Sequence, residues 1–335
     1  MHGDLRGTRA CRRLDDGTAI YIVGDRDPWV RLDLFLKERI PKLSRERIQA
    51  AIRDRVEAPG HGRARPATRL RPGDTVIIRR EEPVHEDEPD VSLPLLHLDE
   101  HLVVVDKPAG ILSHPSRRVA RACVTHILAR QVEGPLHLVH RLDRETTGVM
   151  AVARSAQAAR VLSSQMARER AGAVKVYLAV VFGEMRAAPD VIELPLGRAS
   201  RSAVYVKRGV DPGGRPARTE LEALAHGGGV SLVRLRLLTG RRHQIRVHLA
   251  ALGHPVVGDK LYGPAESHYL RAIAGVFDDR MRRELLTERQ LLHAARLELT
   301  HPATGERAVF DAPLPADLRG FLEERLGQIP AAACA

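Results

Sequence analysis

The stretch HRLDRETTGVM, residues 140–150, places one carboxylate, Asp143, in the middle of a basic turn. His140 and Arg141 precede this acid, and Arg144 follows it directly. Two interpretations are open. In the first, the stretch is a solvated surface loop with incidental ion pairs, which is the more frequent role of a lone acid. In the second, the neighbouring cations hold the carboxylate ionised, because opposite charge favours the charged form, and it acts on an anionic substrate.

Charge and composition indicate a polyanionic partner. The 335 residues include 53 Lys or Arg and 42 Asp or Glu, a net charge of +11, and the apolar share of 44% suffices for two ordinary cores. Such a balance favours nucleic acid or, less often, an anionic membrane. The three cysteines are far apart and fit neither a disulfide framework nor a zinc site. With no apolar signal segment and no long apolar run, we expect a cytoplasmic protein that does not span a membrane.

The chain divides into a small basic unit and a large mixed one. Residues 1–28 are expected to be a poorly ordered leader. Residues 29–80 carry two helix patterns, a Pro-Gly-Asp turn and a short strand, with 14 basic and 6 acidic residues, a net charge of +8. An acidic, proline-containing linker spans 81–93, and a tail spans 326–335. Strands and helices alternate over 94–325 without a strict βαβ rhythm, which favours an α+β fold over a doubly wound sheet.

A strand pattern, KVYLAVVFG, places Lys175 and Tyr177 on one face, because alternate residues of a strand point to the same side. Tyr177 could stack on a base and use its phenol as a polar group. The alternative is an ordinary strand tyrosine at the rim of a core, and the pattern alone favours neither.

The stretch TGRRHQIRVHLAALGHPVVGDKLYG, residues 239–263, gathers basic side chains at the start of a predicted helix. Arg241 and His243 lie at the turn, and Arg246, one turn inside the helix, could reach a carboxylate such as Asp143. A helix N-terminus with arginines favours phosphate or carboxylate. A solvated basic helix is the alternative.

Together, these stretches resemble the RluA-type pseudouridine synthases. HRLDRETTG is similar to the signature of that family, which centres on a catalytic aspartate. The similarity continues in order along the chain, through VVVDKPAGILSHPS (103–116), KVYLAVVFG, GRPARTELEAL (214–224), LLTGRRHQIRVHLAALGHPVVGDKLYG and LLHAARLELTHPATGERAVFDAPLP (291–315). Residues 29–80 resemble the alpha-L RNA-binding motif that often precedes this enzyme domain. The resemblance covers about 29–325 and implies a mixed, largely antiparallel sheet in the catalytic domain.

The resemblance implies that the protein isomerises uridine to pseudouridine within an RNA chain, with no cofactor and no metal. Asp143 is the implied catalytic aspartate, Arg246 pairs with it, and Tyr177 stacks on the uracil and helps to remove its C5 proton. Whether the aspartate forms a covalent adduct or takes the 2′ proton stays open. The RNA is expected to be large-subunit ribosomal RNA, with transfer RNA as the alternative, and no obligate protein partner is implied. Residues expected to contact the RNA are Lys107, Arg141, Lys175, Arg241 and His243.

Two departures from the family pattern and two rival functions accompany this interpretation. Thr147 stands where the family more often has serine, a change that keeps the hydroxyl. The loop VEAPGHGRARP (56–66) replaces a common Val-Asn-Gly sequence in the small domain. One rival is an RNA-binding protein or RNA chaperone with an inactive synthase domain. The other is a carboxylate-dependent glycosidase, which needs a second positioned acid, and the signature offers only Glu145.

Overall fold

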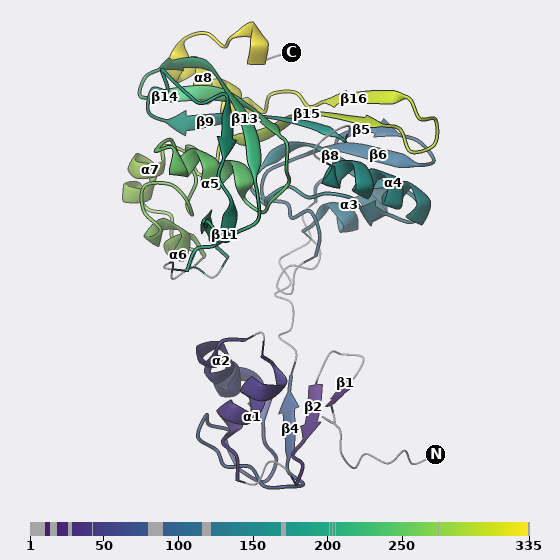
Figure 1. The fold of residues 1–335 in the computed structure, drawn as a ribbon, viewed down its shortest axis with the longest axis vertical. Coiled ribbons are helices and arrows are strands. Elements are labelled where there is room, and N and C mark those ends of the chain that lie inside the picture. Colours follow the sequence, from purple (N-terminus) through teal and green to yellow (C-terminus); the bar gives the residue numbers. More distant parts are fainter. Residues whose placement is uncertain are drawn as a thin grey trace. The chain divides into compact units, whose positions relative to one another are not determined.

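A computed structural model describes residues 11–13, 19–25, 29–41, 43–79, 90–115, 122–168, 172–200, 202, 204, 206–273 and 275–333. The chain forms two compact units, Met1–Val84 and His85–Ala335 (Figure 1). Most of the linker predicted at 81–93, residues 81–89, lies outside the described residues. None of the described helices is long and apolar enough to cross a membrane.

The small unit packs two helices against a four-stranded antiparallel sheet. Its elements are β1 (Cys11–Arg13), β2 (Ala19–Ile22), α1 (Leu32–Arg39), α2 (Arg45–Arg55), β3 (Val56–Glu57) and β4 (Thr75–Ile78), in the strand order β1-β2-β4-β3. Ser44 caps α2 by accepting a hydrogen bond from the Arg47 amide at 3.3 Å. The apolar faces of both helices are buried with Val76 of β4 in one core.

The sheet of this unit includes residues that the sequence analysis assigns to a leader. Ala19–Ile22 of β2 pair with Thr75–Ile78 of β4. Tyr21 is buried and packs edge-to-face on Phe35, with 6.5 Å between the ring centroids. The unit therefore begins before residue 29, because β2 finds its partner strand at the far end of the unit. The rest of the predicted leader, 1–10, 14–18 and 26–28, lies outside the described residues.

The large unit is built on one ten-stranded sheet, which is antiparallel except where β8 and β15 run parallel. Its main path has the order β10-β13-β14-β9-β15-β8-β6-β5, and β16 pairs with β15 and β7 with β8. These strands are β5 (Leu95–Leu98), β6 (Leu102–Lys107), β7 (His137–Leu138), β8 (Thr147–Ala153), β9 (Val174–Phe182), β10 (Val191–Glu193), β13 (Arg218–Gly227), β14 (Val230–Leu237), β15 (Leu292–Thr300) and β16 (Arg307–Asp311). A separate pair joins β11 (Leu196–Arg198) and β12 (Arg208–Val210). The predicted α+β fold with a mixed, largely antiparallel sheet is confirmed.

Helices cover both faces of the large sheet. They are α3 (Val124–Gln131), α4 (Ala156–Ala167), α5 (Gln244–Ala251), α6 (Ser267–Ile273), α7 (Asp279–Leu285), α8 (Ala316–Leu326) and the short 3-10 helix η1 (Ala331–Ala333). Alternate residues of β9 divide between the two faces. Tyr177, Ala179 and Val181 share a core with α3 and α5, whereas Leu178 and Val180 share one with α8. Figure 1 shows α5 and α8 on opposite sides of β9 and β14.

Two backbone features shape the loops at the edge of this sheet. Gly148 of β8 has a φ of +107°, and a Cβ there would lie 2.1 Å from the Ala294 carbonyl oxygen of β15, so only glycine fits this close approach. Helix α5 begins directly after His243, whose backbone is left-handed with a φ of 58°. The loop that precedes β8 and the turn that precedes α5 line one cavity together with β9.

Candidate active site

One cavity of about 390 Å³ collects most of the residues that the sequence analysis singled out. Seven of the eight predicted site residues line it, from the loop before β8, from β9 and from the start of α5: Arg141, Asp143, Lys175, Tyr177, Arg241, His243 and Arg246. Among the described residues that line the cavity, Asp143 is the only acid. The basic, aromatic and acidic groups that the sequence places far apart are therefore within one enclosure.

The loop that carries Asp143 is held by hydrogen bonds on both sides of the acid. Ser113 Oγ accepts from the Leu142 amide at 2.9 Å and donates to the Leu142 carbonyl at 2.8 Å. The Thr146 amide donates to the Asp143 carbonyl at 3.2 Å, which closes a turn. Because the backbone is fixed before and after Asp143, the carboxylate has a defined direction.

Arg246 bridges two carboxylates inside the protein. Its NH1 group donates to Asp143 Oδ2 at 2.7 Å, the contact that the sequence predicts. Its Nε and NH2 groups donate to Asp259 Oδ2 and Oδ1 at 2.6 and 2.8 Å, a planar two-pronged contact. Asp259 is fully buried and also accepts from the amides of Leu261 and Tyr262 at 2.9 and 3.0 Å. The guanidinium is thus anchored rigidly on one edge and directs its remaining nitrogen at Asp143.

The sequence analysis missed Asp259. This acid follows Gly258, whose φ is +78° and whose Cβ position would lie 1.8 Å from the Arg289 carbonyl oxygen, so that only glycine fits. The turn at this glycine folds Asp259 back onto α5. The sequence does show an acid directly after a glycine, which indicates a turn. It does not show that this turn brings the acid back to Arg246.

The bridge keeps Asp143 ionised. Burial raises the pKa of Asp143, but the adjacent Arg246 outweighs burial, and the pKa lies below its ordinary value. Burial lowers the pKa of Arg246, but Asp259 and then Asp143 raise it well above its ordinary value. The three side chains together carry one net negative charge. Since Arg246 bonds to Oδ2, the oxygen of Asp143 that remains for a substrate is Oδ1.

His243 is neutral and lies beside the same carboxylate. The Tyr262 hydroxyl accepts from the Arg208 amide at 2.9 Å and can donate its own proton to His243 Nδ1, 2.8 Å away. Burial lowers the pKa of His243 to about 4, and the ring is uncharged at neutral pH. With Nδ1 accepting, the ring proton lies on Nε2, which is 3.8 Å from Asp143 Oδ1. Tyr262, which the sequence analysis also missed, lies with its ring centroid 4.9 Å from the Arg246 guanidinium.

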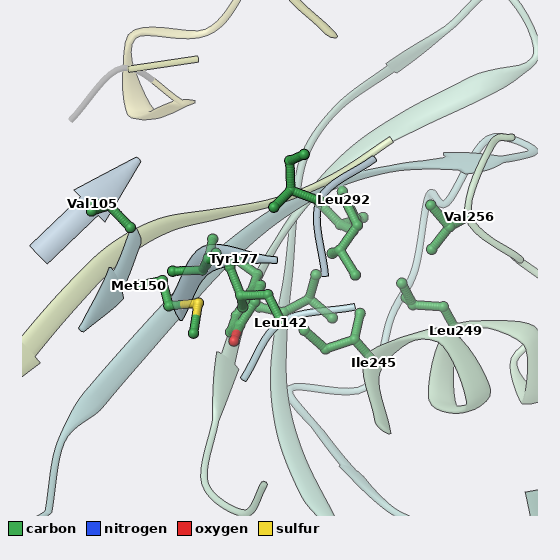
Figure 2. Close-up of a cluster of buried hydrophobic side chains, with 14 of the residues drawn as sticks. Val105, Leu142, Met150, Tyr177, Ile245, Leu249, Val256 and Leu292 are labelled. Atoms are coloured by element: carbon green, nitrogen blue, oxygen red, sulfur yellow. The ribbon is translucent and has the colours of Figure 1, made fainter. Parts of the chain in front are cut away.

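Tyr177 belongs to the apolar wall of the cavity. Figure 2 shows its ring with Leu142, Met150 and Ile245 in one cluster of buried side chains. Burial, and then the charge of Asp143, raise the pKa of Tyr177 well above its ordinary value, so its hydroxyl stays protonated at neutral pH. The ring can stack on a base, and the hydroxyl can donate a hydrogen bond.

Two further polar groups line the cavity beside Tyr177. Lys175 Nζ donates to the Met166 carbonyl of α4 at 3.1 Å, and burial lowers the pKa of this amine. His140 Nε2 accepts from the Ala151 amide at 2.9 Å, which assigns the ring proton to Nδ1. Burial, and then the charge of Lys175, lower the pKa of His140 to about 4, so this ring is neutral. His140 was not predicted as a site residue, although it stands in the signature stretch.

Arginines gather on the solvent side of the cavity. Arg141 and Arg242 are exposed. Burial of part of its side chain lowers the pKa of Arg242, and the charges of Arg141 and Arg208 lower it further. Arg241 is oriented through its Nε, which donates to the Pro216 carbonyl at 2.9 Å. Like charges at such close range are stabilised by an anion between them, so this rim suits the phosphates of a nucleic acid.

Comparisons with known proteins point to one family. The family profile described as RNA pseudouridylate synthase matches residues 101–251, which contain Asp143, Tyr177 and Arg246. A protein of Chloroflexus aurantiacus described as an uncharacterized RNA pseudouridine synthase is 37% identical over 88% of this chain and 89% of its own length. The chain belongs to the RNA pseudouridine synthase family.

Another relative and a solved structure support the assignment of the chain to this family. The ribosomal large subunit pseudouridine synthase D of Xanthomonas campestris is 34% identical over 92% of this chain and 93% of its own. The solved structure of human RNA Pseudouridylate Synthase Domain Containing 1 covers 68% of this chain with a TM-score of 0.53 and 28% identity, over 86% of its own length. The resemblance found in the sequence is confirmed, and the protein is an isomerase of RNA uridines.

Lys107 of the synthase lies away from the cavity. The sequence analysis expects it to contact RNA, but its side chain is fully buried, and its Nζ donates to the carbonyls of Pro108, Ile111 and Arg144 at 2.8, 2.9 and 3.1 Å. Burial lowers the pKa of Lys107 to about 7, whereas three carbonyl acceptors suit the three protons of an ammonium group. Lys107 therefore ties the turn after β6 to the loop that carries Asp143, and it is not placed to touch a phosphate.

The second acid of the signature does not face the cavity. Glu145 accepts from Lys260 Nζ at 2.6 Å and from the Gln290 amide at 3.3 Å. It is not among the described residues that line the cavity. A glycosidase needs two carboxylates on either side of one bond. In the described part of the cavity Asp143 stands alone, so the geometry does not support the glycosidase alternative.

Within the described ranges, one group of side chains has a spacing compatible with a metal ion, and it lies outside the cavity: His97, Asp99 and His301, with candidate ligand atoms within 4.8 Å of one another. Asp99 Oδ2 is 2.6 Å from His97 Nε2 and 2.9 Å from His301 Nε2. His301 Nδ1 accepts from the Thr304 amide at 3.2 Å, so its proton lies on Nε2. A ligating histidine instead donates from its second nitrogen, so these contacts describe a hydrogen-bonded group.

Proposed function

We propose that this pseudouridine synthase uses Asp143 as its catalytic carboxylate, on uridines of large-subunit ribosomal RNA. The observation that carries the proposal is the position of Asp143, which is the one acid described in the cavity. Arg246 holds one of its oxygens and leaves Oδ1 for the substrate. A carboxylate so placed is a nucleophile or a base that needs no activation.

The reaction breaks the bond between C1′ of the ribose and N1 of uracil and forms one between C1′ and C5. The proton on C5 is lost and N1 gains one, so atoms and electrons balance within the isomerisation. Asp143 Oδ1 either attacks C1′ and forms a covalent glycosyl ester, or removes the 2′ proton to leave a glycal. Both routes require the ionised form, which Arg246 maintains.

The walls of the cavity suit a detached uracil that must turn before it rejoins. Tyr177 offers a flat apolar face, and its protonated hydroxyl serves as a hydrogen-bond donor. His243 offers the Nε2 proton on the Oδ1 side of Asp143. Both groups are uncharged at neutral pH.

Ribosomal RNA is proposed from the relatives and from the charge of the chain. The Xanthomonas campestris relative is named for the large ribosomal subunit. The exposed Arg141 and Arg242 beside the cavity are placed to meet phosphates. A uridine within a helix must first be extruded, which costs a few kcal/mol, and phosphate contacts offset that cost. The alpha-L motif at 29–80 is proposed as a second RNA contact.

Mapping of pseudouridines in ribosomal and transfer RNA tests the whole proposal. A strain that lacks the gene should lose one or more pseudouridines in large-subunit ribosomal RNA. The wild-type gene should restore them and an Asp143→Asn gene should not. Loss confined to transfer RNA would contradict the ribosomal assignment, and restoration by the Asn gene would contradict the catalytic one. An inactive RNA chaperone, the remaining rival, predicts no lost site at all.

A further inference from the structure

Trp29 is the sole tryptophan of the chain, and it lies outside the core of the small unit. Its side chain is 54% exposed. The other two aromatic residues of Met1–Val84, Tyr21 and Phe35, are buried and pack edge-to-face on each other. The Trp29 ring therefore lies at the surface of this unit and not in its core.

The backbone fixes Trp29 in an uncommon conformation. Its φ of 59° lies in the left-handed region, which bulky side chains rarely adopt. The Leu70 amide donates to the Val30 carbonyl at 2.9 Å, and Arg69 NH1 donates to the Trp29 carbonyl at 3.4 Å. Two other described non-glycine residues have a positive φ, and one of them is His243 in the catalytic cavity. Backbone strain of this kind clusters where a side chain is presented to a ligand.

An arginine already lies against the Trp29 ring. The guanidinium carbon of Arg71 is 4.6 Å from the ring centroid. The turn that carries this arginine is fixed, because Asp74 Oδ2 accepts from the Arg71 amide at 2.6 Å and contacts His61 Nε2 at 2.6 Å. Arg69 and Arg71 are both exposed. A ring with a guanidinium on one face can take a second flat group on the other, as aromatic residues do when they bind single-stranded nucleic acid.

We propose that Trp29 is a stacking platform for an unpaired RNA base, with Arg69 and Arg71 placed to contact the adjoining phosphates. Every base has a π face, so such a site tolerates sequence variation. A protein partner would also cover an exposed ring, but the net charge of +8 over 29–80 and the two flanking arginines favour nucleic acid. The inference rests on RNA as the substrate, yet it concerns binding by the small unit and leaves the chemistry of Asp143 untouched.

Tryptophan fluorescence of the full chain tests the site directly, because one indole gives the whole signal. The probe is a single-stranded oligoadenylate of ~12 nucleotides, about the span of one single-strand-binding domain. It contains no uridine, so its binding does not depend on turnover. Saturation should quench the emission of Trp29, whereas a fully paired RNA duplex of the same length should leave it nearly unchanged. Binding itself is followed by the anisotropy of a dye on the RNA.

Three variants of the full chain separate stacking from hydrophobic contact. Trp29→Leu keeps an apolar side chain but loses the ring, and should weaken oligoadenylate binding about 5- to 150-fold. Trp29→Phe keeps a ring and should stay within about threefold of the parent. Leu34→Ala removes another exposed apolar side chain of the same unit, 45% exposed, and should have no effect.

Three results would overturn the stacking site: no binding of oligoadenylate, binding without a change in emission, or equal loss in the leucine variant and the Leu34→Ala control. A failure of the proposed function looks different. In that case the emission is still quenched by oligoadenylate, while pseudouridine mapping shows no lost site. The two measurements therefore distinguish a wrong binding site from a wrong enzyme assignment.

Discussion

Each unit of the molecule contains a cluster of arginine and carboxylate side chains, but the numbers of the two groups are reversed. In the large unit one arginine, Arg246, bridges two carboxylates, of which Asp143 faces the cavity. In the small unit one fully buried carboxylate, Asp33, accepts from two arginines, with Arg31 Nε and Arg45 NH2 each at 3.0 Å. The cluster in the large unit has a net charge of −1, and the cluster in the small unit has a net charge of +1.

The difference shows how the same ion pair serves two purposes. The arginine of the large unit is buried, and it fixes the anion that is proposed to carry out the chemistry. In the small unit the acid is buried, and the Arg31 and Arg45 side chains are 40% and 54% exposed, so the acid fixes cations at the surface. A buried charge with its partners in place is costly to disturb. Both clusters therefore hold their geometry, and removing each one should affect a different step.

The largest effect is expected from the carboxylate of the large unit. Asp143→Asn keeps the shape of the side chain but removes the nucleophile and base. Turnover should fall by at least about 10³-fold, as it does when one member of a catalytic group is removed. RNA affinity should change little, because the small unit and the rim arginines are intact. The measurements are single-turnover pseudouridine formation and equilibrium RNA binding by the same protein preparation.

A neighbouring acid provides the control for this variant. Glu145→Gln removes the other carboxylate of the signature, which contacts Lys260 and does not line the cavity. Its turnover should stay within about threefold of the parent, because this partly buried carboxylate pairs with Lys260 outside the cavity. Equal losses in Asp143→Asn and Glu145→Gln would refute the assignment of a single catalytic acid.

The next effect tests whether Arg246 orients the acid or binds RNA. A lysine at position 246 keeps the charge but has no planar fork, so it cannot contact Asp143 and the two oxygens of Asp259 at once. Turnover should drop about 10²-fold, a loss similar to that of one charge-stabilising donor, with RNA affinity and its salt dependence unchanged. Asp259→Asn, which weakens the same bridge from its other end, should lower turnover in the same direction. A lysine variant with normal turnover and weak, salt-sensitive binding would place Arg246 on the RNA instead.

The third effect addresses the small unit as a whole. Deletion of residues 1–90 removes the basic unit 29–80, with its net charge of +8, together with the acidic stretch 81–90. It leaves Leu93, whose amide donates to Gln131 Oε1 of the large unit at 2.8 Å. RNA affinity should fall about 10- to 100-fold and its salt dependence should flatten, since fewer phosphates are neutralised. The rate at saturating RNA should be unchanged. A folded truncation with the same salt dependence as the full chain would show that the small unit does not bind RNA.

Local features of the sequence predicted the elements well. Helix α2 has a serine cap and an apolar stripe within one short stretch, and β9 and α5 appear where their patterns place them. Strand β2 was missed because its assignment depends on pairing with β4, far along the chain. The beginning of the small unit could not be derived from the residues before Trp29 alone.

Seven of the eight predicted site residues line the cavity, whereas residues that fold back onto it from a later turn were missed. Asp143 and Arg246 were expected to meet, and they do. Asp259 and Tyr262 reach the site only because a turn after α5 folds back, which spacing does not reveal. Lys107 was expected to meet RNA, yet it ends among carbonyls, because a sequence does not show whether a lysine is covered. The missed residues all hold other groups in place.

A smaller effect is expected from the acid of the small unit. Asp33→Asn removes the charge that fixes Arg31 and Arg45 and leaves their donors only partly satisfied, at a cost of about 1–3 kcal/mol to that unit. RNA affinity should fall about three- to tenfold as the arginines lose their orientation, with turnover at saturating RNA unchanged. Glu38→Gln, an exposed acid on the same helix, is the matched control. Unchanged affinity in the Asp33 variant would mean that this pair has no part in binding.

The smallest effect is expected from pH, and it sharpens the contrast between the two clusters. The pKa of Asp143 is lowered by Arg246 after allowance for burial, so the active anion is already formed at pH 5. His243, with a pKa of about 4, is neutral over the same range. Turnover at constant salt should therefore vary less than about twofold between about pH 5.5 and 8 and decline only toward pH 4. In the lysine variant at position 246 the acid limb should move to higher pH, because the carboxylate loses its close partner.

Stability sets the lower limit of that profile. The pKa of Asp259 in the folded protein is lowered by Arg246, although burial opposes it. Its contribution to stability is therefore complete above the unfolded value of about 3.9 and is lost as the pH falls below it. Thermal unfolding at each pH separates this loss from the protonation of Asp143. A step in turnover near pH 7, with stability unchanged, would contradict the assignment, because the pKa values of Asp143 and His243 both lie well below 7.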